Sequence, residues 1–357
     1  MLDNDQSVRL NLLRFPLIVG VVFIHANANA VFFSGKQIGV EQNDFMSDFI
    51  RNIISNGIAQ IAVPTFFLLS GYLFFYGFEW SKERYFLKLK SRIKTLLIPF
   101  LFWNICSLLI IFLAQYFPAT KIYFSGNSPL IAEFSFFDFF NAIFGFNRFP
   151  ISYQFWFIRD LMILVLFVPL IQIILKYRPL LFLAIVFISW FLNYWPIFAP
   201  SSNTVLFFCS GAYIATIDKS LFAGDKYGGV FVLLFIVILT LNALNINVVF
   251  HNYLHKAGII IGIYAALFST KFLLKTDNVK PALLWLGRSS FFVFAIHEPL
   301  LTILRKVSYK LFVPDTSALI LLLYFMIPIV IIVFSVLLYR VLVGIAPNFT
   351  YIITGGR

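Results

Sequence analysis

Long apolar runs separated by short polar segments fill most of the 357-residue chain. A helix needs about 20 apolar residues to cross the hydrocarbon core of a bilayer, and most of these runs reach or approach that length. We therefore predict an all-α protein, a polytopic bundle of about ten transmembrane helices formed as a single domain over residues 1–357. The predicted spans are Leu10–Phe33, Ile58–Phe78, Thr95–Phe117, Phe155–Leu175, Leu180–Ala199, Thr204–Ile217, Gly228–Asn245, Ala257–Leu274, Ala282–Leu304 and Ala318–Gly344.

Composition supports a lipid-facing surface. Hydrophobic residues make up 61% of the chain and charged residues only 12%, about half the share that a soluble domain carries. The first seven residues lack the basic region with which a signal peptide begins. We therefore expect the first apolar run to be a retained helix and not a signal peptide.

The positive charge of the chain orients the predicted spans. The net charge is +12, from 27 Lys and Arg against 15 Asp and Glu, and in a soluble protein it would indicate nucleic acid. In a membrane protein, basic residues gather on the cytoplasmic side. The connection Glu79–Lys94 holds six of them, so we place it in the cytoplasm together with both termini, and expect no nucleic-acid partner. Three basic residues in Arg305–Lys310, a predicted outer segment, depart from this pattern.

The longest predicted outer connection is Pro118–Gln154. Within it, Glu133–Phe146 is apolar and aromatic with a few polar breaks. This pattern is typical of a helix that lies in the membrane interface, and it fits a re-entrant cover over a cavity equally well.

Ionisable residues inside apolar spans indicate function, because each costs about 2.5–3.5 kcal/mol at mid-membrane. Arg14 and His25 are eleven residues apart in the first span, which is about 16 Å of helical rise on a similar face. Arg14 then lies near the cytoplasmic interface and His25 in the outer half. The ninth span begins inside, which brings His297 and Glu298 to a depth similar to that of His25. The alternatives are a snorkelling anchor for Arg14 and a structural histidine at His25.

Other polar positions have two interpretations each. Arg159 and Asp160, near Trp156, are either an interfacial pair or the wall of an outward-facing cavity. His251 and His255 have the i, i+4 spacing of a metal site, but a solvated outer loop is the favoured interpretation.

Small residues and cysteines indicate less about function than the ionisable residues do. Ser70–Gly71 in the second span would allow close helix packing. Cys106 and Cys209 have no disulfide or metal-ligand spacing, and no metal is expected.

Four motifs, in their order, carry a resemblance to a known family. They are Arg14 with His25, VPTFFLLSGYLFF at Val63–Phe75, RYFLKLKSRIKTLLIPF at Arg84–Phe100, and FWFIRDL (Phe155–Leu161) with LGRSSFFVFAIHEPL (Leu286–Leu300). Together they resemble the acyltransferase family 3 membrane proteins, which transfer acyl groups to carbohydrates. The second motif is similar to the branch that acts on bacterial surface polysaccharides, such as the O-acetyltransferase of enterobacterial common antigen. The sequence departs from the family where Phe15 and Pro16 follow Arg14. It departs again before Trp156, where the family often has His and this chain has Gln154 and Phe155.

The resemblance implies a donor and an acceptor. The donor is a cytoplasmic acyl-CoA, expected to be acetyl-CoA, and the acceptor is a hydroxyl of a cell-surface or lipid-linked polysaccharide. The expected location is the bacterial cytoplasmic (inner) membrane, with many spans in the lipid bilayer. A covalent acyl-histidine intermediate and a homo-oligomer both stay open. The competing class is a transporter or flippase for a polysaccharide or lipid-linked sugar.

The resemblance also implies residue roles. His25 is expected to be the general base, and Glu298 or His297 to orient it or bind the acceptor. Arg14, assigned to catalysis as well, is expected to hold the CoA phosphates with Arg92 and Lys94. Substrate binding is expected at Trp156, Arg159 and His297.

Overall fold

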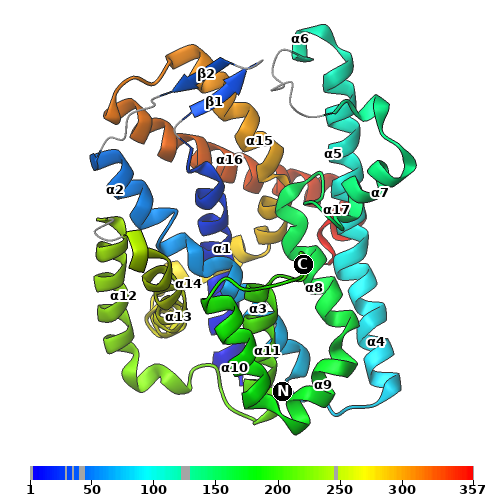
Figure 1. Cartoon of the computed structure of the whole chain (residues 1–357), viewed down its shortest axis with the longest axis vertical. Coiled ribbons are helices and arrows are strands. Elements are labelled where there is room, and N and C mark those ends of the chain that lie inside the picture. Colours follow the sequence, from blue (N-terminus) through cyan, green and yellow to red (C-terminus); the bar gives the residue numbers. More distant parts are fainter. Residues whose placement is uncertain are drawn as a thin grey trace. The chain divides into compact units, whose positions relative to one another are not determined.

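The structure is a computed structural model that describes residues 3–28, 30–33, 36–39, 45–121, 129–244 and 248–356. Helices dominate it, and the only strands in these ranges form one short hairpin, so the prediction of an all-α protein is confirmed (Figure 1). The helices are α1 Asn4–Ala26, α2 Phe45–Ile54, α3 Ala62–Phe75, α4 Lys82–Arg92, α5 Ile98–Tyr116, α6 Pro118–Lys121, α7 Phe136–Phe144, α8 Trp156–Leu166, α9 Val168–Tyr177, α10 Pro179–Phe191, α11 Ser202–Thr216, α12 Gly228–Ala243, α13 Val248–Leu273, α14 Val279–Gly287, α15 Ser290–Phe312, α16 Ser317–Ile345 and α17 Pro347–Thr354. The strands are β1 Ala30–Phe33 and β2 Lys36–Gly39, which pair antiparallel.

Six of the described helical segments are long and apolar enough to cross a membrane, and two broken helix pairs raise this number to eight. The broken pairs are Tyr153–Leu166 with Val168–Tyr177, and Val279–Gly287 with Ser290–Phe312. The fifth and sixth predicted spans correspond to shorter helices, α10 with 13 residues and α11 with 15. A multi-pass membrane protein is therefore supported, and each predicted span has a helix or a broken pair at its place.

Three predicted boundaries are wrong. The first helix ends at Ala26, and residues 30–33 of the predicted span form strand β1. Asn27 follows Ala26 directly. An asparagine side chain can hydrogen-bond to nearby backbone groups in place of the helical bonds, so asparagine favours helix ends over helix interiors. The histidines at 251 and 255 lie in helix α13 and not in a loop, and Arg305–Lys310 continues helix α15.

The chain forms two compact units, and each is assembled from three stretches of sequence. Unit 1 holds residues 1–21, 52–93 and 160–290, and unit 2 holds residues 22–51, 94–159 and 291–357. Since both units draw on the whole length of the chain, they are not successive domains. The single-domain assignment stays a prediction.

Close helix packing builds unit 1, where α3 lies against α11. A Cβ atom at Gly71 would lie 1.9 Å from the carbonyl oxygen of Phe208, and one at Gly211 would lie 2.0 Å from that of Leu68. Only glycine fits at such a backbone contact. The close approach predicted at Ser70–Gly71 is confirmed.

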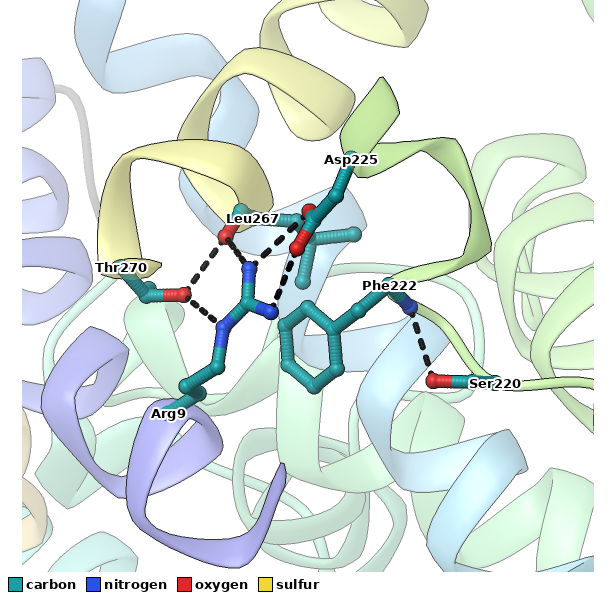
Figure 2. Close-up of polar contacts among 6 residues, drawn as sticks. All are labelled: Arg9, Ser220, Phe222, Asp225, Leu267 and Thr270. Atoms are coloured by element: carbon teal, nitrogen blue, oxygen red, sulfur yellow. Dashed lines mark hydrogen bonds and ion pairs between the residues drawn. The ribbon is translucent and has the colours of Figure 1, made fainter. Parts of the chain in front are cut away.

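A buried arginine ties the start of α1 to two other segments of unit 1 (Figure 2). The Arg9 guanidinium forms a bidentate ion pair with Asp225, with N–O distances of 2.7 and 3.1 Å. It also donates to Thr270 Oγ1 and to the Leu267 carbonyl, and stacks 3.7 Å above the ring of Phe222. Every nitrogen of the guanidinium has a partner, which is the condition under which a buried charge is tolerated.

In unit 2, α5 lies against α7 and α17. The indole of Trp103 donates to the carbonyl of Ile353 at 3.0 Å, which joins α5 to α17. Helix α7 begins with a capping box between Ser135 and Asp138 and ends at Gly145, whose φ of 69° suits glycine. The segment Glu133–Phe146 contains this helix, and its place, at the membrane interface or as a re-entrant cover over a cavity, stays a prediction.

Candidate active site

The carboxyl end of α1 presents His25 in unit 2, and α15 holds this end in place. The last carbonyl groups of a helix have no partner within the helix, so a cation is favourable there. Arg305 on α15 donates to the carbonyl of His25 at 3.0 Å, and the hydroxyl of Tyr309 donates to that of Ala28 at 2.9 Å. These two bonds fix the backbone from which the His25 side chain projects.

A kink in α15 positions the predicted carboxylate. Glu298 leaves the helical conformation with φ −107° and ψ 133°, directly before Pro299. Proline has no N–H group, so the carbonyl of Ala295, four residues earlier, loses its helical partner. The side chain of Gln154 replaces it, because its Nε2 donates to the carbonyls of Ala295 and Glu298 at 3.2 and 3.1 Å. Gln154 therefore satisfies the groups that the kink frees.

One hydroxyl connects the predicted base to the predicted carboxylate. The Tyr153 hydroxyl lies 3.0 Å from His25 Nδ1 and 3.1 Å from Glu298 Oε1. An ionised carboxylate only accepts hydrogen bonds, so the hydroxyl donates to Glu298, and its oxygen accepts from Nδ1–H of His25. This hydrogen-bond network assigns the tautomer in which Nε2 of His25 is unprotonated and can act as a base.

A second imidazole lies beside the first. The rings of His25 and His297 have centroids 5.3 Å apart, and His297 is fully buried. Nδ1 of His297 donates to the carbonyl of Phe294 at 2.6 Å, which leaves Nε2 as an acceptor. Among the described residues, this Nε2 has no hydrogen-bond partner. A buried acceptor of this kind can receive the hydroxyl of a ligand.

Comparison with known proteins decides the family. The family model described as "Acyltransferase domain", acyltransferase family 3, matches residues 7–340. The chain belongs to acyltransferase family 3. Succinoglycan biosynthesis protein ExoH of Rhizobium meliloti (strain 1021) is 28% identical to it over 189 residues, which cover 50% of this chain and 45% of that protein. The match thus spans about half the length of this curated relative. No solved structure matches the chain significantly.

The three residues predicted to bind CoA phosphates lie on three different elements. In unit 1, Arg14 lies on α1 with an exposed side chain, and the half-buried Arg92 ends α4 with its guanidinium 5.9 Å from the ring centre of Phe74. In unit 2, Lys94 is exposed in the π-helical turn η2, Ile93–Leu97. Binding of CoA phosphates by these three residues stays a prediction.

Arg159 and Asp160 contact different segments. The buried guanidinium of Arg159 donates to the carbonyl of Gly145 at 2.6 Å, which fixes the loop after α7. The carboxylate of Asp160 accepts from Ser201 N and Thr204 Oγ1 at the start of α11. Trp156 is half-buried in the first turn of α8. Roles of Arg159 and Trp156 in substrate binding stay predictions.

Sequence reasoning missed three residues that complete the site, namely Tyr153, Gln154 and Arg305. Arg305 had a signal, since it belongs to Arg305–Lys310, a predicted outer segment with three basic residues. Gln154 stands where the sequence departs from the family pattern. Tyr153 had no signal, because it contacts His25 across 128 positions of sequence.

Proposed function

We propose that this member of acyltransferase family 3 transfers an acyl group, expected to be acetyl, from cytoplasmic acyl-CoA to a hydroxyl of a cell-surface or lipid-linked polysaccharide. The observation that carries the proposal is the hydrogen-bonded series His25, Tyr153 and Glu298, which equips a histidine as a base. Family membership and a relative named for succinoglycan biosynthesis support an acyl transfer to a polysaccharide.

The proposed reaction begins at Nε2 of His25. This nitrogen takes the proton of the sugar hydroxyl while the hydroxyl oxygen attacks the carbonyl carbon of the thioester. The carbon–sulfur bond then breaks, the imidazolium returns the proton to the CoA thiolate, and the products are a sugar ester and free CoA. Tyr153 and Glu298 hold the Nδ1–H group throughout, as the carboxylate does in a serine protease triad. Nε2 of the neighbouring His297 accepts a second hydroxyl of the sugar.

The donor would bind from the cytoplasmic side. CoA carries several phosphate charges, which arginine and lysine bind well. Arg92 and Lys94 are two positions apart in the basic segment that the charge asymmetry assigns to the cytoplasm. Arg14 lies near the middle of α1, ten residues after its first residue Asn4, and the amino-terminal end of this helix is assigned to the same side. These residues would hold the phosphates, while the acyl group reaches the histidines.

A reconstituted system tests this function. Proteoliposomes would contain acyl-CoA labelled in its acyl group, and the polysaccharide would be supplied outside. We expect labelled ester on the polysaccharide and one released CoA for each ester, with none from protein-free vesicles or unacylated CoA. A transporter or flippase would move glycan without transferring label, and this result would refute acyl transfer.

A further inference from the structure

A small polar cavity in unit 1 is lined by residues to which no role has been assigned. Its volume is about 230 Å³, and Asn52, Asn56, Asn242 and His251 line it. Asn52 belongs to the last turn of α2 and Asn56 to the turn that follows, while Asn242 lies in the last turn of α12 and His251 in the first turn of α13.

Two glycines bring the walls of this cavity together. A Cβ atom at Gly57 would lie 2.4 Å from the side chain of Leu239, so the turn after Asn56 packs directly on α12. A Cβ atom at Gly258 would lie 2.9 Å from the side chain of Ile238 and 3.7 Å from Nδ2 of Asn242. Helix α13 therefore lies close against α12 at the level of the cavity.

The polar groups of the cavity are partly oriented and partly unsatisfied. Nδ2 of Asn56 donates to Oδ1 of Asn52 at 2.7 Å, which orients both carboxamides. Asn242 is only 8% exposed, and its Oδ1 has no hydrogen-bond partner among the described residues. An unpaired buried carbonyl is unfavourable, so a ligand that donates a hydrogen bond to Asn242 would be stabilised.

The lining selects the class of ligand. Three carboxamides and an imidazole both donate and accept hydrogen bonds, as sugar hydroxyls do, and none of the four side chains is Arg, Lys, Asp or Glu. A phosphate or carboxylate would favour arginine or lysine. A metal ion would favour a cluster of His, Cys, Asp or Glu, and the described part of the chain holds no group of three that could bind one. A neutral sugar fits best.

We propose that this cavity binds one neutral sugar residue of the acceptor glycan. Its volume lies below the roughly 300–1,000 Å³ of pockets for drug-sized ligands and suits a single sugar ring. The predicted topology assigns all four residues to the outer face, where the polysaccharide is expected. The identity of the ligand as acceptor rests on the proposed function, whereas its neutral, hydroxylated chemistry rests on the cavity alone.

Direct sugar binding tests the proposal. Saturation-transfer NMR on the full-length protein in nanodiscs would use glucose, galactose and N-acetylglucosamine, with glucose 6-phosphate as the charged comparison. We expect at least one neutral sugar to bind, and Asn242→Leu and Asn52→Ala each to weaken it about threefold to tenfold, the effect of one lost hydrogen bond. The control Asn278→Ala removes an exposed carboxamide that makes no cap hydrogen bond, and should bind like wild type. Thermal unfolding confirms that each variant is folded.

The outcomes separate this site from the proposed function. If His25→Ala binds the sugar normally while Asn242→Leu does not, the cavity binds sugar independently of the chemistry. Binding that depends on Asn242 in a protein that acylates nothing would keep the cavity and refute the proposed function. A folded protein that acylates glycan but binds no neutral sugar, or binds it equally well in both cavity variants, overturns the inference. Tighter binding of glucose 6-phosphate than of any neutral sugar also overturns the inference.

Discussion

Two hydrogen bonds meet at the Tyr153 hydroxyl, and they determine which nitrogen of His25 carries a proton. The side chain of Tyr153 is 38% exposed, whereas Glu298 is 4% exposed. A ligand can therefore approach the tyrosine and histidine while the carboxylate stays covered. Glu298 also accepts hydrogen bonds from the side chain and backbone of Thr302, which fix the carboxylate.

Tyr153→Phe should lower the rate of acyl transfer about 10–100-fold and change the thermal midpoint little. The variant keeps the ring but removes the hydroxyl that fixes the tautomer of His25, and hydrogen bonds to charged groups contribute about 1.5–3 kcal/mol. Steady-state kinetics with labelled acyl-CoA would measure it. Tyr116→Phe, at a tyrosine that is 75% exposed, is the matched control. Equal rates of acyl transfer in the two variants would show that the Tyr153 hydroxyl has no role in catalysis.

At single positions, the sequence indicated His25, His297 and Glu298 because charged or titratable groups are costly within apolar spans. The structure brings these three together in unit 2. Their connection through Tyr153 was not predictable, since it depends on how α8 and α15 pack. Periodicity and composition contain no information on that packing.

At the scale of elements, the kink in α15 depends on a residue of another segment. Gln154 belongs to the 3₁₀ turn η4, Tyr153–Phe155, directly before α8. It supplies the hydrogen bonds that α15 loses at Pro299, and the neighbouring Tyr153 reaches the carboxylate of the kink residue. The turn η4 therefore stabilises the kink through Gln154 and contacts the carboxylate at the kink through Tyr153.

Gln154→Leu should lower both stability and activity. It leaves the buried carbonyls of Ala295 and Glu298 without their donor, which costs about 1–3 kcal/mol. Gln154→Glu, of similar size but with an ionised carboxylate that cannot donate, should behave likewise. Thermal unfolding would be compared with Gln172→Leu, whose buried Oε1 has no partner within the described ranges, so this control should keep its midpoint. A full wild-type midpoint and rate in Gln154→Leu would contradict the support assigned to this side chain.

The ion pair of Arg9 and Asp225 allows a second test at this scale. Arg9→Met leaves a carboxylate without its partner, and we expect a loss of about 1.5–3 kcal/mol in the free energy of unfolding. Adding Asp225→Leu should recover part of this loss, because replacing both charged groups removes the unpaired charge. A double-mutant cycle by denaturation measures the coupling. Purely additive losses would mean that the pair contributes no stability of its own.

The sequence predicted the positions of the long helices well and their ends less well. Apolar length identifies a helix such as α16, but it does not show that α1 ends at Ala26 or that α13 begins before His251. Those ends depend on local polar residues and on pairing such as that of β1 with β2. The breaks within two predicted spans were also missed, because an apolar run remains apolar on both sides of a break.

At the scale of the whole molecule, the charge asymmetry predicts the orientation in the membrane. Cysteine labelling would test it in a variant that lacks Cys106 and Cys209. A membrane-impermeant maleimide on intact cells should spare Lys90→Cys and modify Glu133→Cys, because the first position is predicted inside and the second outside. Both side chains are exposed, so accessibility does not separate them. Labelling of Lys90→Cys in intact cells would contradict the predicted orientation.

The family match covers nearly the whole chain, and the candidate site uses the two ends and the middle of the sequence. Histidine from α1, tyrosine from the turn before α8 and glutamate from α15 meet within unit 2. The motifs that indicated the family are distant in sequence, and their residues His25, His297 and Glu298 lie together in unit 2. Acyl transfer at His25 is the central claim that follows.

The rate of glycan acylation by His25→Ala tests this claim most directly. The variant should acylate about 10²–10⁴-fold more slowly than wild type, the usual loss for a general base, while acyl-CoA affinity and thermal midpoint stay nearly unchanged. Arg14→Ala, measured in parallel, should weaken acyl-CoA binding as well as turnover. Loss of folding in His25→Ala would support a structural histidine instead. Normal glycan acylation by a folded His25→Ala protein would contradict the account.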